Sequence, residues 1–119
     1  MVDLYSGFDL FGRFLDVSAL RARVIAHNVA NQNTPGYRRK DVRFEEFLAR
    51  ALDQGGGSRL FSIEPQVYAP PGGTVKPDGN NVVLEDEIAL NAKNEILFQV
   101  VSQALRWRFA LYREALQER

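Results

Sequence analysis

The stretch after Gly79 constrains the fold most, because residues 80–119 contain neither glycine nor proline. Apolar and small side chains recur through it in alternating steps of four and three residues, a spacing that places them on one face of a helix. Acidic residues gather at its start and arginines near its end, as the helix dipole favours. We predict one long helix over residues 83–119. Its main face carries Leu84, Ile88, Asn91, Glu95, Phe98, Ser102, Leu105, Phe109, Tyr112 and Leu116.

This predicted helix is too long for a compact domain. At about 1.5 Å per residue it would be on the order of 50 Å long, whereas a compact domain of 119 residues is about 35 Å across. A second apolar row lies beside the first and comprises Leu90, Leu97, Val101, Ala104, Leu111 and Ala115. Two paired helices would leave part of so wide a surface uncovered. The pattern therefore predicts a protein that assembles with other copies or other chains.

The N-terminal part of the chain carries a matching apolar face with the same period. It is formed by Leu4, Phe8, Phe11, Leu15, Ser18, Ala22, Ile25 and Val29, and a flanking row adds Leu10, Phe14, Val17 and Val24. We predict a mainly α fold in which this helix and the C-terminal helix form a coiled-coil-like pair.

The middle of the chain differs in kind, because glycines and prolines concentrate between Gly55 and Gly79. Such density excludes a continuous helix and predicts, over residues 53–82, a flexible linker or a small hairpin. Short strands there would use Phe61, Ile63, Val67, Val75 and Val82. Before it, residues 42–52 predict a short amphipathic helix. Its inward side would hold Phe44, Phe47, Leu48, Ala51 and Leu52. Segments 1–52, 53–82 and 83–119 would form one structural unit.

Two features of the C-terminal helix have alternative interpretations. Asn91, Glu95 and Ser102 occupy core-type positions, where polar residues fix helix register and partner number; alternatively, the helix face turns to solvent there. Trp107 lies between two arginines, and tryptophan and arginine are common anchors at protein interfaces. Burial of Trp107 within the subunit is the alternative.

Composition argues against several kinds of function. The net charge is zero and the pI is near 6.6, so no broad basic surface marks a nucleic-acid-binding protein. The cluster Arg38–Lys40 with Arg43 is balanced by neighbouring acids. There is no apolar run of transmembrane length. His27 is the single histidine and cysteine is absent, so neither a metal site nor a nucleophilic catalytic set can be assembled. We expect no enzyme activity and no cofactor.

The predicted N-terminal helix ends in the sequence Ala30-Asn31-Gln32-Asn33-Thr34-Pro35-Gly36-Tyr37. The side chains of Asn31, Asn33 and Thr34 compete with helical hydrogen bonds, and Pro35 with Gly36 favours a tight turn. Every fixed position of this stretch resembles the Ala-Asn-x-Asn-Thr-Pro-Gly-Tyr signature of the rod and hook proteins of the bacterial flagellum. The family motif therefore comprises Ala30, Asn31, Asn33, Thr34, Pro35, Gly36 and Tyr37.

Within these axial proteins, residues 16–52 and 78–116 resemble the FlgB family of proximal rod proteins, whereas residues 53–77 carry no family signal. The sister family FlgC shares the turn motif and stays open as an alternative. The resemblance implies a structural subunit that polymerises through its terminal helices, connects the membrane ring to the more distal rod and transmits torque. The residues we expect at assembly interfaces are Phe8, Phe11, Leu15, Ile25, Val29, Ile88, Phe98, Leu105, Trp107, Phe109 and Tyr112.

The implied partners are other copies, other rod proteins, the membrane-ring protein and its adaptor, and the flagellar export apparatus. The N-terminus lacks the features of a Sec-type signal peptide, which alone favours the cytoplasm. The resemblance implies instead export by the flagellar apparatus without a cleaved signal peptide, and a place in the periplasmic rod of the basal body. A cytoplasmic coiled-coil adaptor, with an accidental turn motif, is the alternative from another class.

Overall fold

The computed structural model of the protein describes residues 6–118, and within them every side chain except those of Ser6 and Ser58. The molecule is elongated, with principal extents of 67 × 29 × 14 Å and a Cα radius of gyration of 18.2 Å. A compact chain of this length would have a radius of gyration of about 13–14 Å. The elements are α1 (Ser6–Ala30), β1 (Asp41–Arg43), α2 (Glu45–Asp53), the 3-10 helix η1 (Gly57–Phe61), β2 (Gln66–Tyr68) and α3 (Leu84–Gln117).

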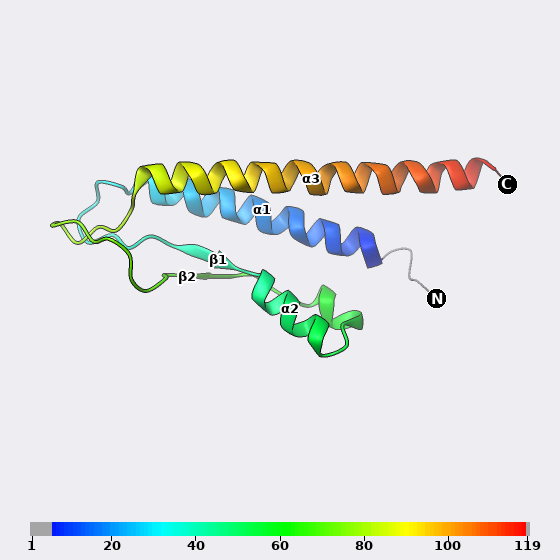
Figure 1. Ribbon diagram of the computed structural model, residues 1–119, viewed down its shortest axis with the longest axis horizontal. Helices are drawn as coiled ribbons and strands as arrows, with labels where there is room; N and C mark the ends of the chain where they lie inside the picture. The colour runs from blue at the N-terminus through cyan, green and yellow to red at the C-terminus, as the bar shows by residue number, and fades with distance from the viewer. Residues whose placement is uncertain (1–5, 119) are drawn as a thin grey trace.

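The two terminal helices confirm the predicted mainly α fold. They lie side by side and run in opposite directions (Figure 1). The α3 helix has 34 residues, begins after Val83 with three acidic residues in its first turn, and projects beyond the start of α1. The predicted positions Leu4 and Arg119 lie outside the described residues.

Contacts at three levels hold α1 and α3 together. Near the open end, the Phe8 ring lies 5.2 Å from that of Tyr112 and 6.1 Å from that of Phe109, centroid to centroid. Midway, the Asn94 side-chain amide donates to the Ser18 carbonyl oxygen at 2.8 Å. Where the connecting segment joins the helices, the same pairing continues through buried polar side chains. The pair is therefore continuous over the length of α1.

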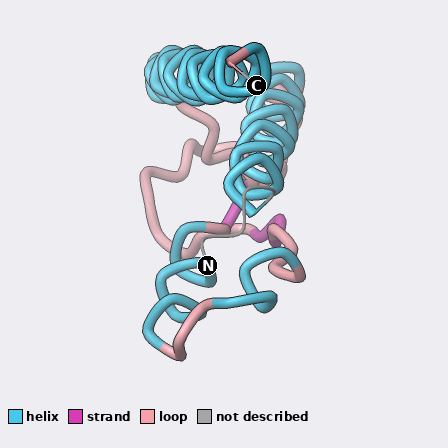
Figure 2. The backbone as a smooth tube through the Cα atoms, turned by 90° about the vertical axis from the view of Figure 1, so that its right-hand side faces the viewer, coloured by secondary structure: helices cyan, strands magenta, loops and turns pink. Residues whose placement is uncertain are grey.

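A second face of α1 forms the core with the middle segment. Val17, Val42, Phe44 and Leu48 are its buried residues, and Phe14 meets Phe44 edge to face with 5.6 Å between ring centroids. This face is the flanking row predicted from the sequence. The α1 helix consequently lies between α3 on one side and β1 with α2 on the other (Figures 1 and 2).

The prediction for residues 42–52 is wrong at its start. Val42 and Arg43 belong to β1, which pairs antiparallel with β2 so that Val42 faces Val67. Val42 is buried against α1, and the Arg43 guanidinium lies 3.8 Å from the centroid of the Tyr68 ring, contacts that an extended backbone permits. The helix begins only at Glu45. Leu52, expected to face inward, is exposed because α2 turns Leu48 and Ala51 to the core.

The middle of the chain is irregular with a short two-stranded sheet, as the predicted fold class has it, but of the two alternatives for residues 53–82 no hairpin lies within that segment. Only Val67 of its predicted residues lies in a strand, and its partner strand precedes that segment. Phe61 is in η1, while Val75 and Val82 lie outside regular structure. After β2, Ala69 is followed by Pro70 and Pro71, and proline cannot donate a ladder hydrogen bond. The strand β2 pairs instead with β1.

Candidate assembly surface and motif turn

The family motif forms a tight turn at the end of α1. The Asn31 side-chain amide donates to the His27 carbonyl oxygen at 2.8 Å, and the Thr34 hydroxyl donates to the Asn31 side-chain oxygen at 3.2 Å. The Thr34 N–H donates to the Asn31 carbonyl oxygen at 3.0 Å. Gly36 has a φ of +75°, a conformation that glycine adopts without steric cost. Local side-chain bonds thus end the helix, as the sequence predicts.

The turn packs against the segment that leads into α3. The Asn80 side-chain amide donates to the carbonyl oxygens of Asn31 and Thr34, each at 2.8 Å, and the Gly36 N–H donates to the Asp78 carbonyl oxygen at 2.9 Å. Gly79 approaches so closely that a Cβ there would lie 3.3 Å from the Gly36 Cα. The two stretches that carry the family resemblance are therefore bound to each other.

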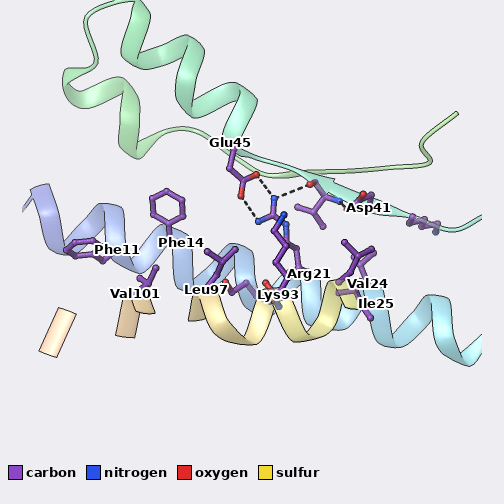
Figure 3. A pocket seen from close by; sticks show the side chains of 15 residues that line it. Phe11, Phe14, Arg21, Val24, Ile25, Asp41, Glu45, Lys93, Leu97 and Val101 are labelled. Carbon is purple, nitrogen blue, oxygen red and sulfur yellow. Dashed lines mark hydrogen bonds and ion pairs between the residues drawn. The ribbon is translucent and has the colours of Figure 1, made fainter. Parts of the chain in front are cut away.

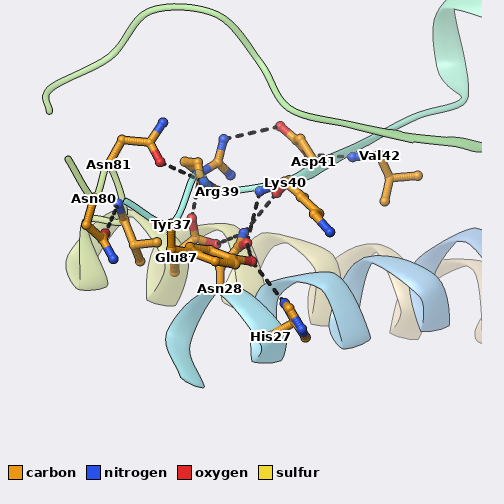
Figure 4. A network of polar contacts seen from close by, with 11 residues as sticks. His27, Asn28, Tyr37, Arg39, Lys40, Asp41, Val42, Asn80, Asn81 and Glu87 are labelled. Atoms are coloured by element: carbon orange, nitrogen blue, oxygen red, sulfur yellow. Dashed lines mark hydrogen bonds and ion pairs between the residues drawn. The ribbon is translucent and has the colours of Figure 1, made fainter. Parts of the chain in front are cut away.

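Behind this turn lies a polar cluster, which we term the junction (Figure 4). It comprises the buried residues Asn28, Asn80, Asn81 and Glu87 and the half-buried residues Tyr37 and Arg39. The Asn28 amide donates to the Lys40 carbonyl oxygen at 2.8 Å and to Glu87 Oε2 at 3.2 Å. The Asn28 oxygen accepts from the Lys40 N–H and the Tyr37 hydroxyl, both at 2.9 Å. Every polar atom of the Asn28 side chain therefore has a partner.

Glu87 supplies the buried charge of the junction. Its side chain is 0% exposed, and Arg39 Nε donates to Glu87 Oε1 at 2.6 Å. A buried carboxylate requires such a partner because water cannot solvate it. Burial raises the pKa of the Tyr37 phenol above its ordinary value of 10.0, and the Glu87 carboxylate raises it further, while Arg39 opposes the shift.

The predicted motif residues thus divide by position. Asn31 and Tyr37 are half-buried and bonded into the fold, whereas Ala30, Asn33, Thr34, Pro35 and Gly36 are exposed at the turn. Sequence reasoning missed Asn28 and Glu87, the centre of the junction. No local signal distinguished them, because Glu87 lies beside Glu85 and Asp86 in an acidic first turn and Asn28 lies one residue after His27.

His27 is exposed beside the motif, and its Nδ1 lies 2.9 Å from the Tyr37 hydroxyl oxygen. Within residues 6–118, no group of three or more His, Cys, Asp or Glu side chains could hold a metal ion. The basic cluster is divided: Arg39 pairs with Glu87 and Asp41, and Arg43 stacks on Tyr68. The described part of the chain contains no helix long and apolar enough to cross a membrane.

The residues predicted for assembly fall into two groups. The half-buried group, Phe8, Phe11, Leu15, Ile25, Val29, Leu105 and Tyr112, lies within the subunit. The exposed group is Ile88, Phe98, Trp107 and Phe109, all on α3. Trp107 is 66% exposed, so its burial within the subunit is excluded.

At the open end of the pair, Arg108 reaches across from α3 to α1. Its guanidinium lies 5.8 Å from the centroid of the Phe8 ring and 6.0 Å from that of Phe11. A Cβ on Gly7 would lie 2.3 Å from the Arg108 guanidinium carbon. A glycine at this position therefore leaves the space that the arginine fills.

Of the three polar positions expected in the core of α3, none is buried. Glu95 is exposed, and Asn91 and Ser102 are half-buried. The face toward α1 is instead centred on Asn94 and Glu87, because the helix is rotated between its two predicted rows. Asn94 and Glu87, neither of them predicted, are the buried polar residues of α3.

The exposed apolar surface of α3 is wider than predicted. It also includes Ile96, Leu97, Val100, Leu111 and Leu116, of which Ile96 and Val100 belong to neither predicted row. Residues 96–105 contain no charged side chain, and this signal could have identified them. At 100° per residue, Ile96, Val100, Trp107 and Leu111 share one side of α3, and Phe98, Phe109 and Leu116 share another. We name the first set the Trp107 strip.

No protein-family model matches this sequence. Comparison with curated proteins finds flagellar basal body rod proteins FlgB. That of Borrelia hermsii is 31% identical over 110 residues, which cover 77% of this chain and 82% of the relative. Those of Borreliella burgdorferi and Escherichia coli K12 are 25% and 28% identical; the matches cover 86% and 76% of this chain and 89% and 78% of the relatives. With similarity over most of both chains, this protein belongs to the FlgB family of flagellar basal body rod proteins, structural components of the motility organelle.

Proposed function

We propose that this chain is a rod subunit that polymerises through its terminal helices, connects the membrane ring to the more distal rod and transmits torque. The observation that carries the proposal is the uncovered apolar surface of α3. Ile96 and Val100 are 61% and 60% exposed, although no charged side chain lies between residues 96 and 105. A helix that is apolar on several sides is normally buried on those sides.

The position of this surface favours an open assembly over a closed dimer. The Trp107 strip and the Phe98 side of α3 face different directions, so one neighbour cannot cover both. Contacts between unlike faces repeat from head to tail, and they generate filaments where the rotation does not close into a ring. Each subunit would thus be contacted on both sides of α3 by neighbouring subunits.

The junction supports a mechanical role. Its buried ion pair and hydrogen bonds join the end of α1, the motif turn and the start of α3. Because these groups are paired and buried, a displacement of one helix is resisted by the other. Torque applied to either helix would therefore pass through the junction to the whole subunit.

Family membership supports the remaining parts of the proposal. The chain would be exported by the flagellar apparatus without a cleaved signal peptide and would reside in the periplasmic part of the basal body. Its partners would be further copies, other rod proteins, the membrane-ring protein and its adaptor. It would have no catalytic activity.

Mass spectrometry of detergent-resistant basal bodies from the source cells tests this function, with the cytosolic fraction as control. We expect the chain to be enriched in basal bodies and to be lost when the rod is removed. Recovery solely from the cytosol of flagellated cells would contradict the rod proposal and favour the adaptor, which predicts a small closed oligomer.

A further inference from the structure

A groove runs along the subunit where α1, α3 and β1 meet (Figure 3). Its volume is about 580 Å³. Apolar side chains from both helices form much of its wall, among them Phe11, Phe14, Leu97 and Val101. The remaining lining is polar and includes the Arg21–Glu45 ion pair and the charged residues Lys40, Asp41 and Lys93. A groove that combines apolar walls with placed polar groups is a usual form of a binding site for an anchoring side chain.

One buried atom in the lining lacks a hydrogen bond. Asn94 lines the groove and is 6% exposed. Its amide nitrogen donates to the Ser18 carbonyl oxygen at 2.8 Å, which fixes the orientation of the amide because a carbonyl only accepts. Asn94 Oδ1 has no donor among the described residues. A buried acceptor without a donor is costly, so this site favours an occupant that brings an N–H.

The same chain exposes a side chain with the complementary chemistry. Trp107 is the only tryptophan and lies in the apolar Trp107 strip. Its indole combines a large apolar surface with one N–H that donates but cannot accept. Trp107 cannot reach Asn94 of its own chain, because thirteen residues of helix separate them by about 20 Å. Only a second copy can bring the two together.

Charges beside the two surfaces are also complementary. Lys93, at the groove, is exposed and forms no ion pair within 4 Å among the described residues, although its charge acts on Glu45 across the groove. Glu114, two helical turns beyond Trp107, is likewise exposed and forms none. A neighbour that seats its Trp107 at Asn94 places its Glu114 about 10 Å further along the helix axis, so this carboxylate and Lys93 attract each other across the interface without forming a direct ion pair.

We infer that the groove of one subunit receives Trp107 of a second copy, with the indole N–H donating to Asn94 Oδ1. This contact rests on the proposed function and specifies one of its interfaces. It joins unlike surfaces, since each copy offers both a groove and a Trp107 strip. Every subunit therefore binds one neighbour and is bound by another, as growth of a filament requires.

Site-directed cross-linking in assembled basal bodies tests the contact, because the chain contains no cysteine. Lys93→Cys marks the groove and Leu111→Cys marks the Trp107 strip. The two positions lie about 27 Å apart along one helix, so a bismaleimide with a reach of about 10 Å can join them only between copies. We expect a ladder of linked chains, with the 93–111 peptide pair identified by mass spectrometry.

The matched control is Ile88→Cys with Leu111→Cys, which places one cysteine on an exposed side of α3 outside the groove. This pair should not give the ladder. Absence of the 93–111 link from basal bodies that contain the doubly substituted chain would overturn the contact and leave the rod function intact. Absence of the unsubstituted chain from basal bodies would instead overturn the rod function.

Fluorescence of the single tryptophan gives an independent measurement. On assembly of the purified chain, Trp107 emission should shift to shorter wavelength as the indole leaves water. Trp107→Phe keeps an aromatic ring but removes the donor, and it should weaken association roughly tenfold. In an Asn94→Leu background the same substitution should have little effect. Assembly with unchanged emission, or an equal effect in both backgrounds, would overturn the hydrogen-bonded contact.

Discussion

The two ends of the helix pair are built in opposite ways. At the junction, Asn28, Glu87 and Asn80 are buried and their polar atoms are paired with neighbouring residues. Along the distal half of α3, large apolar residues stand in solvent. The subunit therefore uses different residues for folding and for assembly. Substitutions at the junction should affect the isolated chain, and substitutions on distal α3 should affect only the polymer.

The largest expected effect on the isolated chain comes from Glu87→Ala. It leaves Arg39 without its closest carboxylate and removes an acceptor from Asn28. Breaking a buried ion pair costs about 3–5 kcal/mol, a large part of the stability of a small domain. Urea unfolding followed by circular dichroism measures the loss. Glu85→Ala, an exposed acid in the same turn, is the control and should cost less than about 1 kcal/mol.

A matched pair of glycine substitutions should differ in sign. Gly79→Ala introduces a Cβ at a φ of +88°, 3.3 Å from the Gly36 Cα, and should destabilise the chain by about 1–3 kcal/mol. Gly12→Ala lies within α1 with no heavy atom within 4 Å of the added Cβ. It should stabilise the helix by about 0.5–1 kcal/mol. Equal thermal midpoints for both variants would contradict the close packing of turn and segment.

Alkaline pH should weaken the junction through Tyr37. Its pKa is raised in the folded chain, first by burial and then by Glu87. The neutral phenol therefore contributes stability below the unfolded pKa of about 10, and this contribution is lost as the pH rises through the folded pKa. Urea unfolding at several pH values above about 9 should show a steeper loss for the natural chain than for Tyr37→Phe. If the unfolding free energy of the two proteins fell equally with pH, the Tyr37 phenol would not be part of the junction.

The smallest effect on the isolated chain is expected on distal α3. Val100→Ser and Leu111→Ser replace exposed apolar side chains, so the unfolding free energy should change by less than about 0.5 kcal/mol. Assembly should nevertheless fall sharply, as measured by sedimentation of the concentrated protein and by swarming of complemented cells. A large loss of monomer stability would show that these side chains are buried within the subunit.

The sequence predicts the two long helices but not which residues are buried between them. The four-and-three spacing of apolar residues predicted both long helices, because helical periodicity is local and strong in α1 and α3. The same pattern could not predict how each helix is rotated about its own axis. The helix α3 carries two apolar rows, and only its packing against Ser18 and Asn28 of α1 selects the face between these two rows. Consequently Asn94 and Glu87 were missed as buried residues.

Contacts between segments that lie far apart in the sequence could not be predicted either. Val42 and Arg43 fit an amphipathic helix in local pattern, but their extended conformation depends on β2, which lies more than twenty residues away. The turn motif and the resemblance of residues 78–116 are both visible in the sequence, yet nothing local indicates that the turn and the start of that stretch touch. Hydrogen bonds such as that from Asn80 to Asn31 become visible only once the fold is known.

Gly36 and Asp78 join the two ends of the middle segment. The Gly36 N–H donates to the Asp78 carbonyl oxygen at 2.9 Å, and the Asn81 N–H donates to the Tyr37 carbonyl oxygen at 3.4 Å. The chain thus leaves the helix pair and returns to it at neighbouring points. Lengthening the exposed stretch around Gly72 would cost only about 0.6 kcal/mol per doubling of the loop. Residues can therefore be inserted into or deleted from the segment between these two points while the two helices keep the same geometry.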